Sequence, residues 1–525
     1  MNFSVPVAPA APAVPAAAAG SVVPAVSMPD LRQSSRVALG FLVLALILGG
    51  VVGAYSLFLM PFAINDGWLF WAMTRAIADA NFALPTRVFY PTTPGAPDLP
   101  FCYPPLGFYV AAALFKIGVP LAQIFRWLPW AWTMATIWAF WRLARAFWRG
   151  QKEGEWAAGA ATLCWALLPW SFIWSVMGGG LTRAPGMLWA FLAIEAAIEL
   201  WRDGRVKKWL PLAIFLALGL ATHLERARFA VVAVGLVWLF YGRSWRGAAQ
   251  LVGALAGAIL VTAPWWGLCL ARFGLAPFVA ASESGGSGWT GGSGLQMLVS
   301  VVTISLTGEA ILPLFHLVGA AGLLWCLWRR QWFLPVWFAL IVLMEVRSGR
   351  TFVLAPLALG AGFFLARLPR ARVPIMGVLA VWLFGLGLLV QQRMPGLAED
   401  DLAALGWASR HAAPDARFLV LPNQNWAMDA PGEWFPALTG RAAVATVQGA
   451  EWLPNAEFRA RRERHDELRR AHDWNAVAAL SARDGLQFDW VWLPRSAPRL
   501  EPGAGWEKQW SQGQSAIWRR AAKLK

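Results

Sequence analysis

Long apolar runs separated by short clusters of arginine and lysine recur along most of this chain, and they constrain its fold more than any other feature. A run of about 20 apolar residues is long enough to cross a membrane as a helix. The chain is 58% hydrophobic and only 14% charged, whereas soluble domains carry about 25% charged residues. The sequence therefore predicts an integral membrane protein.

Eleven apolar runs are counted as membrane spans, although several are short and their ends are approximate. The runs cover residues 37–64, 121–140, 156–176, 184–200, 209–222, 229–241, 248–270, 311–328, 332–346, 351–366 and 373–390. They predict a polytopic α-helical membrane protein with about 11 spans.

The basic clusters between the runs indicate how the chain crosses the membrane, because Lys and Arg gather in short cytoplasmic loops. Arg32 and Arg36 precede the first run and place the N-terminus in the cytoplasm. An odd number of spans then places the C-terminus outside the cell (inner) membrane. Counting 105–118 as a span would turn the later basic clusters outward, so we interpret this short segment as juxtamembrane or re-entrant.

Composition divides the chain into three regions. Residues 1–30 are rich in Ala, Pro and Val and predict a disordered cytoplasmic segment. Residues 31–391 hold the spans and a large first outer loop at 65–120. Residues 392–525 have ordinary charge and predict a C-terminal extracytoplasmic α/β domain. This last region is expected to contain two buried strands and one charged helix, at 418–421, 490–493 and 456–471.

Charge and cysteine usage argue against several kinds of function. The net charge of +16 lies largely between the apolar runs, where basic residues signal topology rather than nucleic-acid binding. The four cysteines show no CxxC or Cys/His spacing, so the sequence supports neither a disulfide framework nor a zinc site. Membrane lipids are expected partners, and nucleic acid is not.

Asp66 lies in the sequence Asn65-Asp66-Gly67, directly after the first apolar run. An acid at the membrane edge is costly to place there and seldom idle. It could act as a general base that removes a proton from an incoming hydroxyl, or it could simply end a helix. The same loop later contains an aromatic-Pro-Pro element that begins at Tyr103, which makes the functional interpretation more attractive.

These features resemble those of GT-C-type glycosyltransferases, multi-span enzymes that use sugars carried on polyprenyl phosphates. The resemblance covers the general layout of residues 32–391. Within these enzymes, the chain distantly resembles the dolichyl-phosphate-mannose and aminoarabinose transferase group. The specific marks of the resemblance are Asp66, the Tyr103 element and Arg350 at the start of a late span. In such enzymes the acid after the first span is catalytic, and arginines at the outer membrane edge hold the lipid phosphate. The resemblance assigns these roles to Asp66 and to Arg347 or Arg350.

The arginines suit that chemistry on physical grounds. A planar guanidinium can bind two phosphate oxygens at once, and it stabilises the negative charge that grows on a departing phosphate. Arg183, beside the glycines at 178–180, is a third candidate, because backbone N–H groups of a glycine turn can approach an anion. Arg347 and Arg350 could also merely flank a span.

The sequence differs from the GT-C-type pattern in the number of acidic residues near Asp66. Many relatives carry a second acid beside the first or in the second outer loop, but here Asn65 precedes Asp66 and the loop at 178–183 has no acid. This argues against a carboxylate-bound divalent metal, which needs several oxygen ligands, and no cofactor is expected. His223 and Glu225, near the outer face, could contact substrate or serve as structural residues.

A second group of candidate substrate contacts lies in the C-terminal region. Trp and Glu together suit sugars, since an indole ring stacks on C–H faces and a carboxylate accepts hydroxyls. The alternative is an inter-domain contact against the membrane part. The candidates are Glu433, Trp434, Arg441, Glu451 and Trp452.

The predicted function is inverting transfer of a hexosyl or pentosyl group from a polyprenyl-phosphate-linked sugar to an unknown acceptor on the outer face. A proton-coupled transporter or lipid flippase using Asp66 as a proton site is the alternative, although transporters usually contain internal repeats and none is evident here. A third hypothesis is a non-catalytic assembly subunit, which would not require Asp66.

Overall fold

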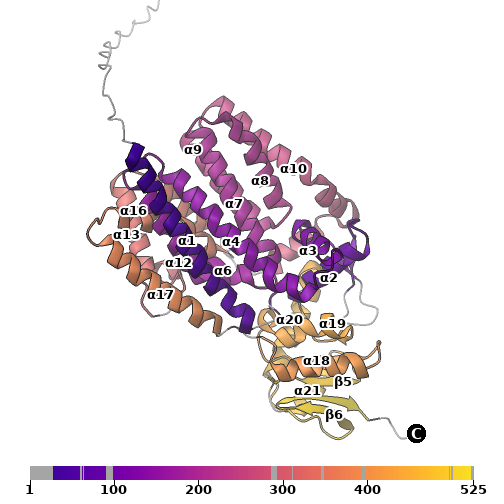
Figure 1. The fold of residues 1–525 in the computed structure, drawn as a ribbon. Coiled ribbons are helices and arrows are strands. Elements are labelled where there is room, and N and C mark those ends of the chain that lie inside the picture. The colour runs from indigo at the N-terminus through magenta and orange to yellow at the C-terminus, as the bar shows by residue number, and fades with distance from the viewer. Residues whose placement is uncertain are drawn as a thin grey trace, which may run out of the picture.

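The structure is a computed structural model in which most of the chain is described. The described residues are 28–59, 62, 64–89, 98–284, 293–309, 311–344, 348–392, 394, 396–495, 497 and 500–521. Figure 1 shows a large helical bundle and, at one end of it, a smaller part that contains the main β-sheet.

Helices occupy all eleven apolar runs that the sequence singles out. The bundle is built from α1 (Met28–Leu59), α4 (Leu121–Trp148), α5 (Gly154–Leu167), α6 (Pro169–Val176), α7 (Gly180–Trp201), α8 (Trp209–Leu220), α9 (Leu224–Tyr241), α10 (Trp245–Phe273), α13 (Leu314–Trp328), α14 (Phe333–Met344), α16 (Leu354–Ala366) and α17 (Arg372–Gln392). The helix α5 is followed by a bend of 51° into α6. Pro169 begins α6, and because proline lacks an N–H it cannot continue the hydrogen bonding of α5.

Length and composition identify fewer membrane spans than the sequence predicts. Within the described ranges, five helices are long and apolar enough to cross a membrane, or six if the bent pair of α5 and α6 counts as one span. The apolar helices α13, α14 and α3 (Leu106–Lys116) are shorter. The count of eleven therefore stays a prediction, whereas the chain's many apolar helices agree with a multi-pass membrane protein.

Small residues let the central helices approach one another closely. A Cβ added at Gly322 of α13 would lie 2.1 Å from the carbonyl oxygen of Gly360 in α16. One added at Gly362 would lie 2.2 Å from the carbonyl oxygen of Ala157 in α5. Close backbone contact at small residues is how helices associate where lipid surrounds them.

Short helices and a small hairpin cover the end of the bundle that faces the sheet-containing part. They are α2 (Gly67–Asp79), β1 (Arg87–Val88), β2 (Leu99–Pro100), α3, α11 (Ala276–Ser284), α12 (Ser293–Val302) and α15 (Gly349–Phe352). The segment 105–118 forms the 11-residue helix α3, which packs beside α2, α4 and α7.

The C-terminal region contains a mixed five-stranded sheet of order β4-β3-β5-β7-β6. The strand β3 is parallel to β4 and β5, and β7 is antiparallel to β5 and β6. The strands are β3 (Arg417–Val420), β4 (Ala442–Ala443), β5 (Trp490–Leu493), β6 (Trp506–Gln512) and β7 (Ser515–Arg520). The buried runs predicted at 418–421 and 490–493 thus form β3 and β5.

Helical segments accompany this sheet. They are α18 (Glu399–His411), η3 (Trp426–Met428), α19 (Ala430–Thr439), η4 (Ala450–Trp452), α20 (Asn455–Arg470) and α21 (Trp474–Arg483), so the charged helix predicted at 456–471 is α20. Figure 1 shows α19 and α20 between the sheet and the bundle. The C-terminal region therefore meets the bundle through helices rather than through its sheet.

Candidate functional site

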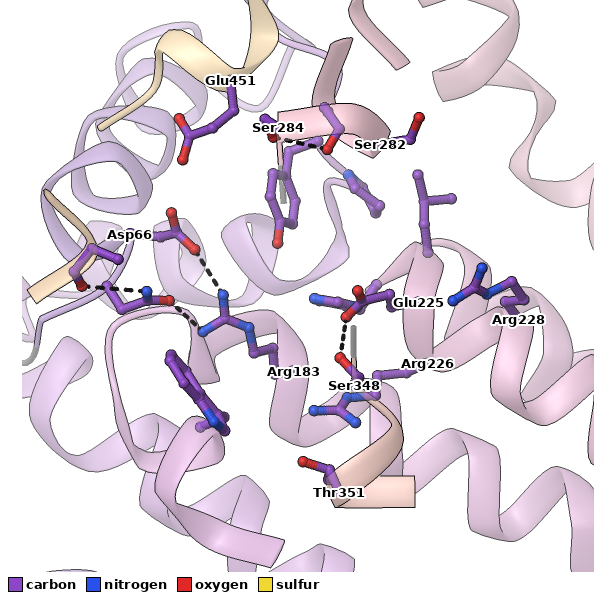
Figure 2. A pocket seen from close by; sticks show the side chains of 18 of the residues that line it. Asp66, Arg183, Glu225, Arg226, Arg228, Ser282, Ser284, Ser348, Thr351 and Glu451 are labelled. Carbon is purple, nitrogen blue, oxygen red and sulfur yellow. Dashed lines mark hydrogen bonds and ion pairs between the residues drawn. The ribbon is translucent and has the colours of Figure 1, made fainter. Parts of the chain in front are cut away.

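A cavity of about 810 Å³ lies where the end of the bundle meets the C-terminal region. Its wall is assembled from segments that are far apart in the sequence, and Figure 2 shows many of their side chains directed into one space. The lining residues on which the following argument depends are Asn65, Asp66, Tyr103, Trp170, Trp174, Arg183, His223, Glu225, Arg226, Arg228, Ser348, Arg350, Trp426, Glu451, Trp452 and Arg462.

Asp66 reaches the cavity from an unusual backbone conformation. Asn65 and Asp66 have φ angles of 68° and 72°, which lie in the left-handed region that few residues other than glycine adopt. Asp66 occupies the N-cap position of α2, yet its side chain makes no cap hydrogen bond. The carboxylate instead faces Arg183, as Figure 2 shows.

Arg183, in the first turns of α7, holds both side chains of the Asn65–Asp66 pair. Its Nη2 donates to Asp66 Oδ2 at 3.0 Å, and its Nη1 donates to Asn65 Oδ1 at 2.7 Å. The guanidinium carbon also lies 5.5 Å from the centre of the Trp174 ring, within range of a cation–π contact. Arg183, expected to bind the donor phosphate, therefore lies against the candidate catalytic acid.

The glycines beside Arg183 also differ from expectation. The amide of Gly178 donates to the carbonyl of Ile64 at 3.1 Å, and the amide of Gly179 donates to the carbonyl of Asn65 at 2.7 Å. The sequence allows these N–H groups to approach an anion, with a flexible turn as the commoner interpretation. They are used instead to fix the backbone that carries Asp66.

Glu433 of α19 holds the same backbone from the opposite side. Its Oε2 accepts from the Asn65 amide at 2.9 Å, and its Oε1 accepts from the Gly67 amide at 2.6 Å. Glu433 is only 2% exposed. Burial raises the pKa of its carboxyl well above the ordinary range, and the nearby charge of Asp66 adds to this, while the backbone N–H groups act in the opposite direction.

Three of the five C-terminal residues predicted to contact substrate are placed away from the cavity wall. Glu433 binds the Asp66 loop, and Trp434 is fully buried against Gly67. Arg441 donates to the backbone carbonyls of Ser409, Ala412 and Thr439. These contacts match the alternative interpretation of an inter-domain contact for Glu433 and Trp434 and a local structural role for Arg441.

Glu451, Trp452 and Tyr103 do line the cavity. The ring of Tyr103 lies 5.5 Å from that of Trp452 and 6.2 Å from that of His223, both edge-on. Burial raises the pKa of the Tyr103 hydroxyl to about 12, and the charge of Asp66 contributes. Tyr103 therefore presents a protonated hydroxyl at physiological pH, beside the rings of Trp452 and His223.

Arg350 enters the cavity from α15. Its Nη2 donates to Ser300 Oγ at 2.9 Å, and its guanidinium carbon lies 5.8 Å from the centre of the Trp170 ring. Nearby, Ser348 Oγ donates to Glu225 Oε2 at 2.7 Å, as drawn in Figure 2. Arg347, the other arginine of the predicted pair, lies outside the described residues.

Sequence reasoning named one further arginine of this cavity, Arg226, as a second place to seek the donor phosphate, and it did not assign Arg228 or Arg462 to the site. Arg226 is 2% exposed and lies over the ring of Phe352 at 4.6 Å, while Arg228 and Arg462 are exposed. Arg228 could have been found from the sequence because it closely follows the candidates His223 and Glu225. Nothing in the sequence of α20 marks Arg462 as a site residue. The lining contains five arginines against three carboxylates, a balance that favours an anionic ligand.

The three carboxylates of the cavity, Asp66, Glu225 and Glu451, come from separate segments of the chain. Across the residues that the structure describes, no three His, Cys, Asp or Glu side chains form a group that could hold a metal ion. Asp66 is engaged by an arginine.

No protein-family model matches the chain, and no curated protein matches its sequence. Solved structures match its fold. The oligosaccharyltransferase AglB from the archaeon Archaeoglobus fulgidus, solved with an inhibitory peptide and a dolichol-phosphate, superimposes with a TM-score of 0.56 at 12% identity, covering 89% of this chain and 70% of AglB. The chain has a GT-C fold.

A second GT-C structure supports the same conclusion. The arabinofuranosyltransferase AftD from mycobacteria matches with a TM-score of 0.55 at 15% identity, covering 95% of this chain and 42% of AftD. At such low identity these likenesses establish the fold alone. The GT-C resemblance noted in the sequence is thus confirmed at the level of fold.

Proposed function

We propose that this protein transfers a sugar from a polyprenyl-phosphate carrier to a hydroxyl group of an acceptor outside the cell membrane. One observation carries the proposal: a single cavity holds Asp66, from the first loop, and Arg350, from a segment almost 300 residues later. The GT-C fold supports the reaction class, and the dolichol-phosphate bound to AglB supports a lipid phosphate as carrier.

Asp66 would act as the general base of this reaction. The acceptor oxygen attacks the anomeric carbon of the donor sugar while its proton passes to the Asp66 carboxylate. The bond from the anomeric carbon to the phosphate oxygen breaks, and its electron pair leaves with the polyprenyl phosphate. A single displacement of this kind inverts the anomeric configuration.

Arg350 would bind the leaving phosphate, where its guanidinium stabilises the charge that develops. Arg226 and Arg228 line the same cavity and add positive charge. Arg183 has a different role in this scheme, because its two Nη atoms already orient Asn65 and Asp66. We therefore assign Arg183 to positioning the base and Arg350 to binding the donor.

In the proposed topology the N-terminus is cytoplasmic and the cavity opens outside the cell (inner) membrane. Residues 31–391 would form the membrane domain and residues 392–525 the extracytoplasmic domain that shapes the acceptor side. Glu451, Trp452 and Tyr103, on the cavity wall, would contact the sugar or the acceptor. His223 and Glu225, at the start of α9, would complete that wall.

The alternative of a proton-coupled transporter finds less support. Its best candidate within a described helix, Glu195, receives two hydrogen bonds from Arg142, at 3.1 and 2.9 Å. Glu199 is paired with Arg149, Arg205 and Lys208. Both acids of α7 are thus tied to basic side chains, and the GT-C fold favours the transferase over the transporter.

The test begins with the lipids that co-purify with the protein, identified by mass spectrometry. A polyprenyl phosphate is expected among them. The purified protein is then incubated with undecaprenyl-phosphate-linked hexoses and pentoses and an envelope extract, and transfer of radiolabelled sugar is measured. Asp66→Asn keeps the side chain's shape but removes the base, so its rate should fall by about two to four orders of magnitude. Wild-type transfer by folded Asp66→Asn would refute the proposed role of Asp66.

A further inference from the structure

We propose that Glu433 is a positioning residue for Asp66: it caps the N-terminus of α2 from the C-terminal region and so leaves the Asp66 carboxylate available to the cavity. This inference rests on the proposed function, in which Asp66 is the base. The C-terminal region would thus help to position the Asp66 carboxylate, in addition to shaping the acceptor side of the cavity.

The first N–H groups of a helix have no partner within the helix. An aspartate at the N-cap usually accepts from these groups with its own carboxylate. Asp66 occupies that position in α2 but makes no such bond. Glu433 accepts from the amide of Gly67, the first residue of α2, at 2.6 Å and from the Asn65 amide just before the helix at 2.9 Å. It therefore satisfies an unpaired N–H of α2 while the Asp66 carboxylate stays directed at Arg183.

The backbone of this turn requires such support. Two successive residues, Asn65 and Asp66, hold positive φ angles, a conformation that persists only where surrounding contacts determine it. Glu433 supplies contacts on one side, and the amides of Gly178 and Gly179 donate to the carbonyls of Ile64 and Asn65 on the other. The conformation directs both side chains of the Asn65–Asp66 pair to Arg183.

Glu433 is itself rigidly placed. Asp429 at the start of α19 receives a 3.1 Å contact from His465 Nε2 of α20, and both side chains are buried. Thr446 Oγ1 donates to the carbonyl of Gly432 at 2.7 Å. Trp434, the residue after Glu433, packs so tightly on Gly67 that an added Cβ there would lie 2.4 Å from its ring.

The experiment compares Glu433→Gln and Glu433→Ala with a control, Glu467→Gln, whose carboxylate binds Arg483 at the surface of the C-terminal region. Sugar transfer, affinity for undecaprenyl phosphate and thermal unfolding are measured for each full-length variant. We expect about 100-fold slower transfer for Glu433→Ala, since a small misplacement of a reacting group can cost that much. Glu433→Gln keeps one acceptor oxygen and should lose less. Lipid affinity should stay within twofold of wild type, and the control should behave as wild type.

Introducing the same substitutions into Asp66→Asn separates positioning from general damage. A residue that acts through Asp66 has nothing further to lose once the base is gone, so the double variant should be as slow as Asp66→Asn alone. Multiplied losses, or lipid affinity falling in step with transfer, would overturn the proposal for Glu433. Wild-type transfer by Asp66→Asn would instead refute the proposed function, and the two failures are therefore distinct.

Hydrogen exchange keeps the proposal testable if Glu433→Ala does not fold. In the wild type the amides of Asn65 and Gly67 should exchange slowly, and Glu433→Gln should accelerate exchange in the peptide around 64–68 while leaving helices such as α7 unchanged. Equal protection in wild type and Glu433→Gln would contradict the cap.

Discussion

Arg183 and Asp66 form an ion pair at 3.0 Å across 117 residues of sequence. The side chains are 12% and 16% exposed, so the pair lies at the cavity wall rather than in bulk solvent, where such pairs contribute little. The same guanidinium binds Asn65. A general base at this site is therefore oriented before any substrate arrives.

Arg183 is predicted to affect the rate of transfer more than donor binding. Arg183→Gln retains one hydrogen-bond donor group but loses the charge and the fork that spans Asn65 and Asp66. We expect transfer to fall about 10- to 100-fold, with affinity for undecaprenyl phosphate changed less than threefold. An equal fall in affinity would instead show that Arg183 binds the donor phosphate, as its position in the sequence first indicated.

Gly67→Ala tests the packing beneath the catalytic turn. The new methyl group would meet Trp434 Cζ2 at 2.4 Å, and Trp434 is fully buried. Overpacking of this kind costs about 1–3 kcal/mol, so thermal stability and transfer should both fall. Gly406→Ala in α18 is the matched control, because its nearest neighbour is the flexible end of Arg410 at 3.9 Å and alanine is the better helix former. Stability equal to wild type in Gly67→Ala would mean that Trp434 moves freely.

Several features of the site were predictable because they are local. A single acid after the first apolar run, an aromatic-Pro-Pro element and an arginine before a late run identify Asp66, Tyr103 and Arg350, and all three line the cavity. Helix-forming segments were equally visible, since apolar periodicity and length are properties of short windows. The number of membrane spans was harder to predict from the sequence, because short apolar helices can cross, enter or lie beside a membrane.

The contacts that shape the site were beyond the sequence because they join distant segments. Glu433 and Asn65 are 368 residues apart, and no periodicity or spacing relates them. Glu433 followed by Trp434 has the composition of a sugar-binding pair, yet α19 turns both residues toward the α2 turn. Arg462 likewise reaches the cavity only because α20 packs against α11 and η4.

The stability of the protein should depend on pH through Glu433. Burial raises the pKa of this carboxyl well above its ordinary value, so at a pH between the unfolded and folded pKa values the folded protein binds a proton that the unfolded chain releases. Stability should therefore decrease as pH rises, starting near the ordinary glutamate pKa of about 4.3 and ending at the raised pKa of Glu433. Thermal unfolding across pH 4–8 should show this decrease in wild type and a smaller one in Glu433→Gln. Parallel profiles would contradict it.

The proposed orientation predicts that the C-terminus lies outside the cell membrane. Alkaline phosphatase fused after Lys525 should be active, and a green fluorescent protein fused there should be dark. As a control, reporters placed in the turn between α4 and α5, at 150–153 and directly after Arg149, should give the opposite pattern. Reversed results at both positions would overturn the proposed orientation and place the cavity, which contains Asp66 and residues of the C-terminal region, on the cytoplasmic face.

Arg350→Lys distinguishes a phosphate-binding residue from a membrane anchor. Lysine keeps the positive charge and also reaches the interface, but it lacks the planar fork that binds two phosphate oxygens. If Arg350 binds the donor, affinity for undecaprenyl phosphate should fall about tenfold, as expected when a charged hydrogen bond is lost. The Arg347→Ala/Arg350→Ala variant should lose more.

The control for this experiment is Arg329→Lys at the far end of α13, where the guanidinium lies over Trp328 at 5.5 Å. It should bind undecaprenyl phosphate like wild type, because an anchor needs only charge and reach. Affinity is measured in nanodiscs beside thermal unfolding, which separates lost binding from lost folding. If Arg350→Lys binds like wild type and the double variant loses only stability, Arg350 is an anchor. The donor phosphate would then be sought at Arg226 and Arg228, which line the same cavity from the first two turns of α9.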